Sequence, residues 1–247
     1  MNMRMMERDA IDWGTADIRI LFRKFFVPTL LGMLSMSAVT AIDGIFVGHG
    51  VGSDGIAAVN ICIPLLMIFT GIGLMAGVGS SVVASIHLAR GKVKAARLKS
   101  LLFVTVVTLV PSVFVMSFPR QTAYLLGASE HLLPMVRDYL VWFVPSLTFQ
   151  MWIAVSLFVI RLDGAPKFAM WCSIVSALIN VVLDWLFIFP LGWGVMGAAF
   201  ATSVSIVTGG VMALSYLLFF ARHLRLHPVK RSRKSLRLSL RNIGYQC

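Results

Sequence analysis

The stretch Ser176-Ala-Leu-Ile-Asn-Val-Val-Leu-Asp184 places an amide and a carboxylate inside a long apolar run. The run extends from Phe168 to Leu191, contains no Lys or Arg, and is long enough to cross a bilayer as a helix. Residues four apart lie on one face of a helix, so Asn180 and Asp184 would form an oxygen-rich spot within hydrocarbon. A charged residue at that depth costs about 2.5–3.5 kcal/mol, and it usually persists because it has a partner, a water-filled cavity or a function.

The composition of the whole chain is typical of a polytopic membrane protein. Of its 247 residues, 58% are hydrophobic and 13% are charged, and the mean hydropathy is +0.87. Cys62, Cys172 and Cys247 show no paired spacing, so neither a disulfide framework nor a metal motif is indicated, and we expect no cofactor. The first 24 residues are polar and mixed in charge, which is unlike a cleavable signal peptide.

The apolar runs predict an all-α polytopic membrane protein built as a six-transmembrane-helix bundle. We expect a cytoplasmic segment at residues 1–24, a membrane lobe at 25–221 and a basic cytoplasmic tail at 222–247. The six predicted spans are about 25–47, 56–88, 98–118, 139–160, 168–191 and 195–220. Residues 16–26 are predicted to form an interfacial helix, with a frayed leader as the alternative. The second span is too long for one straight crossing, the connection at 119–138 has room for a short surface helix, and the prolines at 28, 64, 111 and 145 are candidates for bends.

The positive charges predict the topology. The net charge is +12, and 20 of the 22 Lys and Arg residues fall in the segments that this span count places on one side. Only Arg120 and Arg137 fall on the other. This positive-inside pattern predicts that both termini are cytoplasmic, in the plasma membrane or, for a bacterium, the inner membrane. Membrane lipid is an alternative partner for the basic tail, and nucleic acid is not expected as a partner.

Several oxygen-bearing side chains are predicted to share one depth in the outer half of the membrane. Asp43, Asp184 and Thr202 lie four to seven residues from the outer ends of their spans, and Asn180 lies one turn deeper. Such a set can bind a proton or a hard cation such as Na⁺, with a backbone carbonyl supplied near the Gly192–Gly197 turn. We expect the two carboxylates to titrate as one unit with Asn180 positioning them. Alternatively, Asp184 or Thr202 could serve only to hold helices together by hydrogen bonding.

Two sets of residues resemble the multidrug and toxic compound extrusion (MATE) transporters. The first is Pro28…Asp43-Gly-Ile-Phe-Val-Gly48…Ala57-Ala58-Val59-Asn60…Pro64. The second is Arg161-Leu-Asp-Gly-Ala-Pro166…Asn180-x3-Asp184…Gly194-Val-Met-Gly-Ala-Ala199…Ala201-Thr202. The resemblance implies cation-coupled export, by H⁺ or Na⁺ antiport, of small organic and often cationic compounds. It also implies a cation site of the N-terminal lobe at Asp43, Asn180, Asp184 and Thr202, with the backbone carbonyl of Ala198.

The chain departs from the family in length, since the family has twelve spans in two six-helix lobes. The sequence ends at Arg241-Asn-Ile-Gly-Tyr-Gln-Cys247, where a seventh span would begin, so it resembles the N-terminal lobe with the inter-lobe linker. In the family, the two lobes face a central cleft, which one lobe cannot enclose. A second copy of the chain could complete this cleft, or another chain could supply the missing lobe. Alternatively, the chain could be a truncated, non-transporting half.

Two further functions remain as alternatives. A lipid-linked sugar flippase of the same superfamily would need a more cationic cavity than these spans offer, because no span carries a central Lys or Arg. An intramembrane aspartyl protease would suit the paired carboxylates, but neither Asp43 nor Asp184 stands in a Gly-x-Gly-Asp context, and we do not expect an enzyme.

Overall fold

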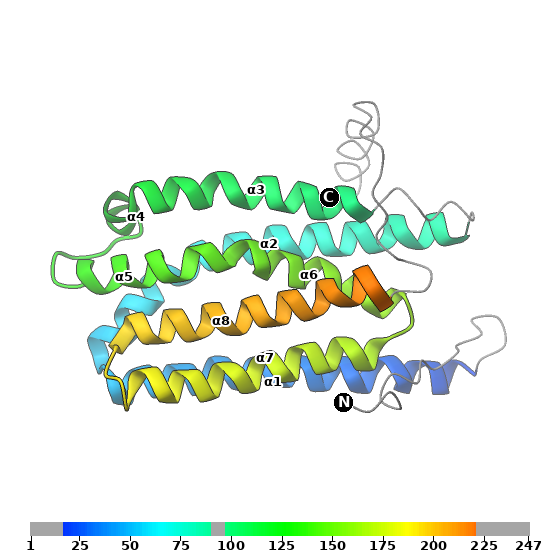
Figure 1. Cartoon of the computed structure of the whole chain (residues 1–247), viewed down its shortest axis with the longest axis horizontal. Helices are drawn as coiled ribbons and strands as arrows, with labels where there is room; N and C mark the ends of the chain where they lie inside the picture. Colours follow the sequence, from blue (N-terminus) through cyan, green and yellow to red (C-terminus); the bar gives the residue numbers. More distant parts are fainter. Residues whose placement is uncertain (1–16, 90–96, 221–247) are drawn as a thin grey trace.

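The computed structural model describes residues 17–89 and 97–220, and these form an all-helical bundle with no strand among them. The helices run side by side along one long axis (Figure 1). In chain order they are α1 (Ile18–Gly50), α2 (Ser53–Ala89), α3 (Arg97–Ser117), α4 (Pro119–Leu125), α5 (Leu133–Phe143), the 3₁₀ turn η2 (Val144–Ser146), α6 (Leu147–Leu162), α7 (Pro166–Ile188), α8 (Gly194–Ser215) and the π-helical turn η3 (Tyr216–Phe220). The predicted fold class is confirmed.

Within the described residues, five stretches are long and apolar enough to cross a membrane. They are Ile18–Gly50, Ser53–Gly79, Leu133–Leu162, Pro166–Ile188 and Gly194–Phe220. The third predicted span corresponds to α3, in which the apolar stretch of described side chains is shorter, Thr105–Ser117. The predicted cytoplasmic segment lies outside the described residues as far as residue 16, and so does the predicted tail from residue 221 onward.

The helix ends follow from local chemistry. The Asp17 carboxylate accepts a hydrogen bond from the backbone N–H of Arg19 and caps α1. Residues 18–26 hold neither Gly nor Pro, so the segment predicted as a separate interfacial helix continues without a break into the first span. Helices α4, α5 and α7 each carry a proline in the first turn, where the missing N–H costs nothing. The short surface helix predicted between the third and fourth spans is confirmed as α4.

The fourth span is divided at Pro145. Here α5 gives way to η2 and then to α6, because proline cannot donate the hydrogen bond that would continue the helix. Pro28, Pro64 and Pro111 stay inside α1, α2 and α3 without interrupting them. Of the four candidate bends, only the one at Pro145 coincides with a change of helix type.

The bundle has two distinct ends. The α1–α2, α4–α5 and α7–α8 connections gather at one end, at the left in Figure 1. We call this the hairpin end, and the opposite end, where α6 turns into α7, the open end. Helices α1 and α2 extend past α6, α7 and α8 at the open end (Figure 1). Helix α1 packs chiefly against α7, and α2 packs chiefly against α6.

The buried core lies mainly along α5 and α6. Its largest fully buried side chains include Leu140, Leu147, Met151 and Ile160. Small residues let neighbouring helices approach closely, as is usual in membrane bundles. A Cβ atom at Gly209 of α8, for example, would lie 3.2 Å from Ile153 Cδ1 and 3.2 Å from Ser176 Oγ. These contacts fix α8 against both α6 and α7.

Candidate functional site

A cavity of about 340 Å³ lies between the helices, walled by α1, α2, α5, α6, α7 and α8. Three of the predicted site residues, Asp43, Asn180 and Thr202, line it. Residues more than 150 positions apart in the sequence therefore lie close together, as expected from their predicted common depth in the membrane. Apolar side chains make up most of the remaining wall, and the described lining contains no Lys or Arg.

The α7–α8 hairpin places Asn180 opposite Thr202. Gly192, with φ +65°, and Gly194, with φ +58°, adopt left-handed backbone conformations that reverse the chain within a few residues. Helix α8 therefore returns along α7. Asn180 Nδ2 approaches Thr202 Oγ1 at 3.3 Å, which leaves the amide oxygen of Asn180 without a hydrogen bond.

Asp184 is fully buried at 0% exposure, one helical turn from Asn180. Neither of its carboxylate oxygens has a hydrogen-bond partner among the described residues. Helix α1 packs along α7, so Asp43 lies within electrostatic range of Asp184. Asp43 Oδ1 is also buried without a partner. The structure thus brings the two predicted carboxylates together but satisfies neither of them fully.

These unpartnered oxygens are what a proton or a hard cation would require. Two carboxylates and one amide contribute four buried oxygen atoms that accept no hydrogen bond from any described residue. Buried polar groups are nearly always hydrogen-bonded, so a cluster of exceptions calls for an explanation such as a bound ion or proton. Carboxylate and amide oxygens are the kind of ligand that a hard cation such as Na⁺ prefers.

The remaining predicted ligand, the carbonyl of Ala198, is not a cavity-lining group. Ala198 is 1% exposed and lies in a small cluster with Val47 and Ile188. Helix α8 is already regular there, because it begins at Gly194. The role of this carbonyl was implied only by the resemblance to the MATE transporters, and it stays a prediction.

Several polar residues of the cavity wall were not predicted as part of a site. Tyr139, which is 4% exposed, lines the cavity and lies within electrostatic range of both Asp43 and Asp184. Asn60, Thr70 and Gln150 also line the cavity. In the sequence, Asn60 was noted only as one residue of the set that resembles the MATE transporters. The signal that selected Asn180, an amide within an apolar run, applies equally to Asn60 and Gln150.

Comparison with known proteins establishes the relationship. The MatE family model matches residues 28–186, which is more than half of the chain. The chain belongs to the MatE family. This match covers α1 to most of α7, including three of the four predicted side-chain ligands.

Known MatE relatives and structures extend the match. The chain is 28% identical over 204 residues to the multidrug export protein MepA of Staphylococcus saprophyticus, covering 80% of this chain and 44% of that protein. It is 26% identical over 202 residues to MepA of Staphylococcus aureus, with 81% and 44% coverage. A solved structure described as protein A superposes with a TM-score of 0.81 at 28% identity, covering 94% of this chain and 54% of that one. A MATE structure in the bent conformation gives a TM-score of 0.78 at 23% identity, with 94% and 53% coverage. The chain spans about half the length of the relatives it matches.

Proposed function

We propose that this MatE lobe is one half of a cation-coupled multidrug efflux antiporter, which exports small organic and often cationic compounds in exchange for H⁺ or Na⁺. The single observation that carries the proposal is the cluster of unpartnered, buried oxygens on Asp43, Asn180 and Asp184 beside a cavity. The names of the staphylococcal relatives, which are multidrug export proteins, support the substrate class. We place the protein in the plasma membrane, or in a bacterial inner membrane, with both termini in the cytoplasm on the basis of its charge distribution.

The cavity suits an organic cation. A volume of about 340 Å³ falls at the lower end of known ligand pockets. Met36, Leu66 and Ile206 offer apolar contact, and thioether side chains adapt to different shapes. The lining carries the carboxylate of Asp43 and, within the described residues, no basic group, which favours positively charged ligands over the pyrophosphate of a lipid-linked sugar.

The coupling mechanism follows from the same residues. Asp43 and Asp184 lie on neighbouring helices, so negative charge on both of them pushes α1 and α7 apart. Binding of a proton or cation removes that repulsion and lets the helices pack more closely. Release of the ion restores the repulsion. The cavity then has two states that differ in affinity for an organic cation, which any coupled exporter requires. Asn180 holds its position through Thr202 and offers the ion its free oxygen.

The test is efflux of a fluorescent organic cation from cells or vesicles that carry this lobe together with a second lobe. Efflux driven by a proton gradient, a Na⁺ gradient or either one would identify the coupling ion. Asp43→Asn should abolish gradient-driven efflux, whereas Asp138→Asn, which alters an exposed acidic residue of α5, should not. Undiminished efflux by Asp43→Asn would overturn the proposal.

A further inference from the structure

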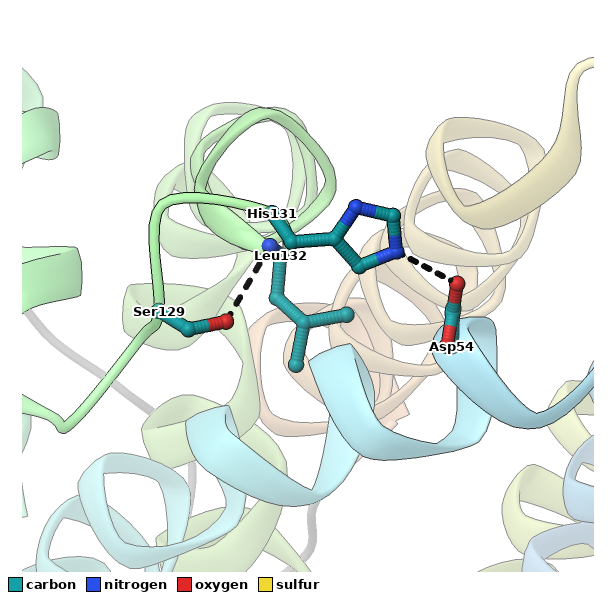
Figure 2. A network of polar contacts seen from close by, with 4 residues as sticks. All are labelled: Asp54, Ser129, His131 and Leu132. Carbon is teal, nitrogen blue, oxygen red and sulfur yellow. Dashed lines mark hydrogen bonds and ion pairs between the residues drawn. The ribbon is translucent and has the colours of Figure 1, made fainter.

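The hairpin end of the bundle holds an ion pair that neither the fold nor the cavity chemistry requires. His131 Nε2 lies 2.8 Å from Asp54 Oδ2 (Figure 2). The two residues are 77 positions apart, in the α4–α5 connection and the first turn of α2. Their side chains are 76% and 48% exposed. The contact therefore joins two separate parts of the bundle in a place that water and protons reach.

Both partners are held in position by local structure. Ser129 fixes the turn around His131, because its hydroxyl oxygen accepts the N–H of Leu132 at 3.4 Å and its carbonyl accepts the N–H of Leu133 at 2.9 Å. The Leu132 side chain points away from the imidazole (Figure 2) and packs against the core. Asp54 stands where the N-terminal dipole of α2 favours an acidic residue. The imidazole is thus presented to Asp54 by a fixed turn.

Among the described residues, the other ionisable groups near this end form no hydrogen bond or ion pair with His131. Tyr124 of α4 donates to Glu130 at 2.6 Å, and His49 Nδ1 contacts the carbonyl of Ile45 in its own helix at 3.0 Å. Helices α4 and α5 also carry Arg120, Arg137 and Asp138, whereas Arg97 and Lys99 of α3 and Arg161 of α6 lie toward the open end of their helices. Asp54 is the one residue with which His131 forms an ion pair in the described part of the chain.

The two elements joined by this pair also wall the cavity. Ile56 lines it two residues after Asp54, and Tyr139 lines it eight residues after His131. We propose that Asp54 and His131 form a proton-sensitive clasp, which draws the hairpin ends of α2 and α5 together at low pH and releases them at high pH. The width of the cavity at the hairpin end would change accordingly. This inference depends only on the contact between two elements that line the cavity. It therefore does not require that the protein exports drugs.

The solvent exposure of the two side chains limits how strongly protonation can favour the closed clasp. Protonation gives the imidazole a positive charge, which converts its contact with the carboxylate into a charge-assisted hydrogen bond. Exposed ion pairs are weak, so protonation should favour the closed clasp about two- to five-fold. A contact of this strength shifts a balance between two arrangements of the hairpin end but does not determine whether the bundle folds.

Distances measured by electron paramagnetic resonance test the clasp directly. Spin labels at Ser53→Cys on α2 and Arg137→Cys on α5 report its opening, since both positions are exposed. The native Cys62 and Cys172 are buried, and Cys247 is replaced by serine. In lipid nanodiscs, lowering the pH from 8 to 5.5 should raise the ratio of short to long distances about two- to five-fold.

Variants of the two residues show whether their contact causes any pH response. His131→Gln keeps an amide nitrogen near the position of Nε2 but cannot titrate, and Asp54→Asn removes the charge from the other side. Each should abolish the response. If one of them fails to fold, the other gives the same test. His49→Gln is the matched control, because His49 is an exposed histidine at the same end that bridges no elements, and it should leave the response intact. Distances that are independent of pH in the parent protein, or a response that survives in His131→Gln, would overturn the proposal.

Discussion

Replacing Asp184 by asparagine separates a coupling role from a structural one. Within the described part of the chain, neither carboxylate oxygen of Asp184 accepts a hydrogen bond, so the substitution breaks no hydrogen bond there. Burial of an ionised carboxylate at this depth costs about 2.5–3.5 kcal/mol, and a neutral amide avoids that cost. The free energy of unfolding of Asp184→Asn should therefore stay constant or rise by up to about 3 kcal/mol. Gradient-driven efflux should fall to background, because the repulsion between α1 and α7 can no longer be switched.

The assay pairs thermal unfolding in detergent with dye efflux from the same preparations. For a protein of this size, about 1 kcal/mol corresponds to about 2–4 °C in Tm. If Asp184 held helices together by hydrogen bonding, its loss would cost about 1–3 kcal/mol and lower the Tm. Asp138→Asn serves as the control for neutralising an acidic residue outside the cavity. A lowered Tm combined with full efflux would refute the reasoning and leave Asp184 as a structural residue.

Three further outcomes are expected. Gly209→Ala should have a lower Tm than Gly71→Ala, because a Cβ at Gly209 would crowd Ile153, whereas a Cβ at Gly71 would meet nothing within 4 Å; equal Tm values would contradict the packing. Asn180→Ala should weaken ion-dependent efflux without abolishing it, because it removes the contact to Thr202 but no charge, and an unchanged ion dependence in transport assays would exclude the site role. A reporter active only in the cytoplasm should give signal when fused to the C-terminus and none in the α4–α5 connection, and the reverse pattern would contradict the positive-inside argument.

The sequence was sufficient for the fold class and for selecting polar residues that the structure places close together. Apolar runs of membrane-spanning length predicted the helices, because a segment in lipid must satisfy its backbone internally. The cost of burying polar groups in hydrocarbon selected Asp43, Asn180 and Asp184 before any geometry was available. The structure then placed Asn180 against Thr202 and brought the two carboxylates within electrostatic range. Whether these residues bind the coupling ion stays a prediction.

Other features could not be predicted from one sequence. Tyr139 stands near the end of a span, where tyrosine is common at the membrane interface, so nothing in its position marked it as part of the cavity wall. The contact between Asp54 and His131 depends on how a connection folds over the start of α2, which no periodicity encodes. The single helix from Ile18 to Gly50 was missed because basic and apolar residues intermix in its first turns, a pattern also typical of interfacial helices.

The cavity arises because α1 and α2 pack against different helices. Only Val51 and Gly52 connect α1 to α2, with Gly52 at φ +93°, so the two helices meet at the hairpin end. From there they diverge (Figure 1), because α1 follows α7 and α2 follows α6. Asp43 therefore faces a space bounded by α2 on its other side rather than a packed neighbour. Under the proposed mechanism, neutralising the carboxylates would shift α1 relative to α7 and so change the width of that space, which would connect ion binding to ligand binding without any longer-range device.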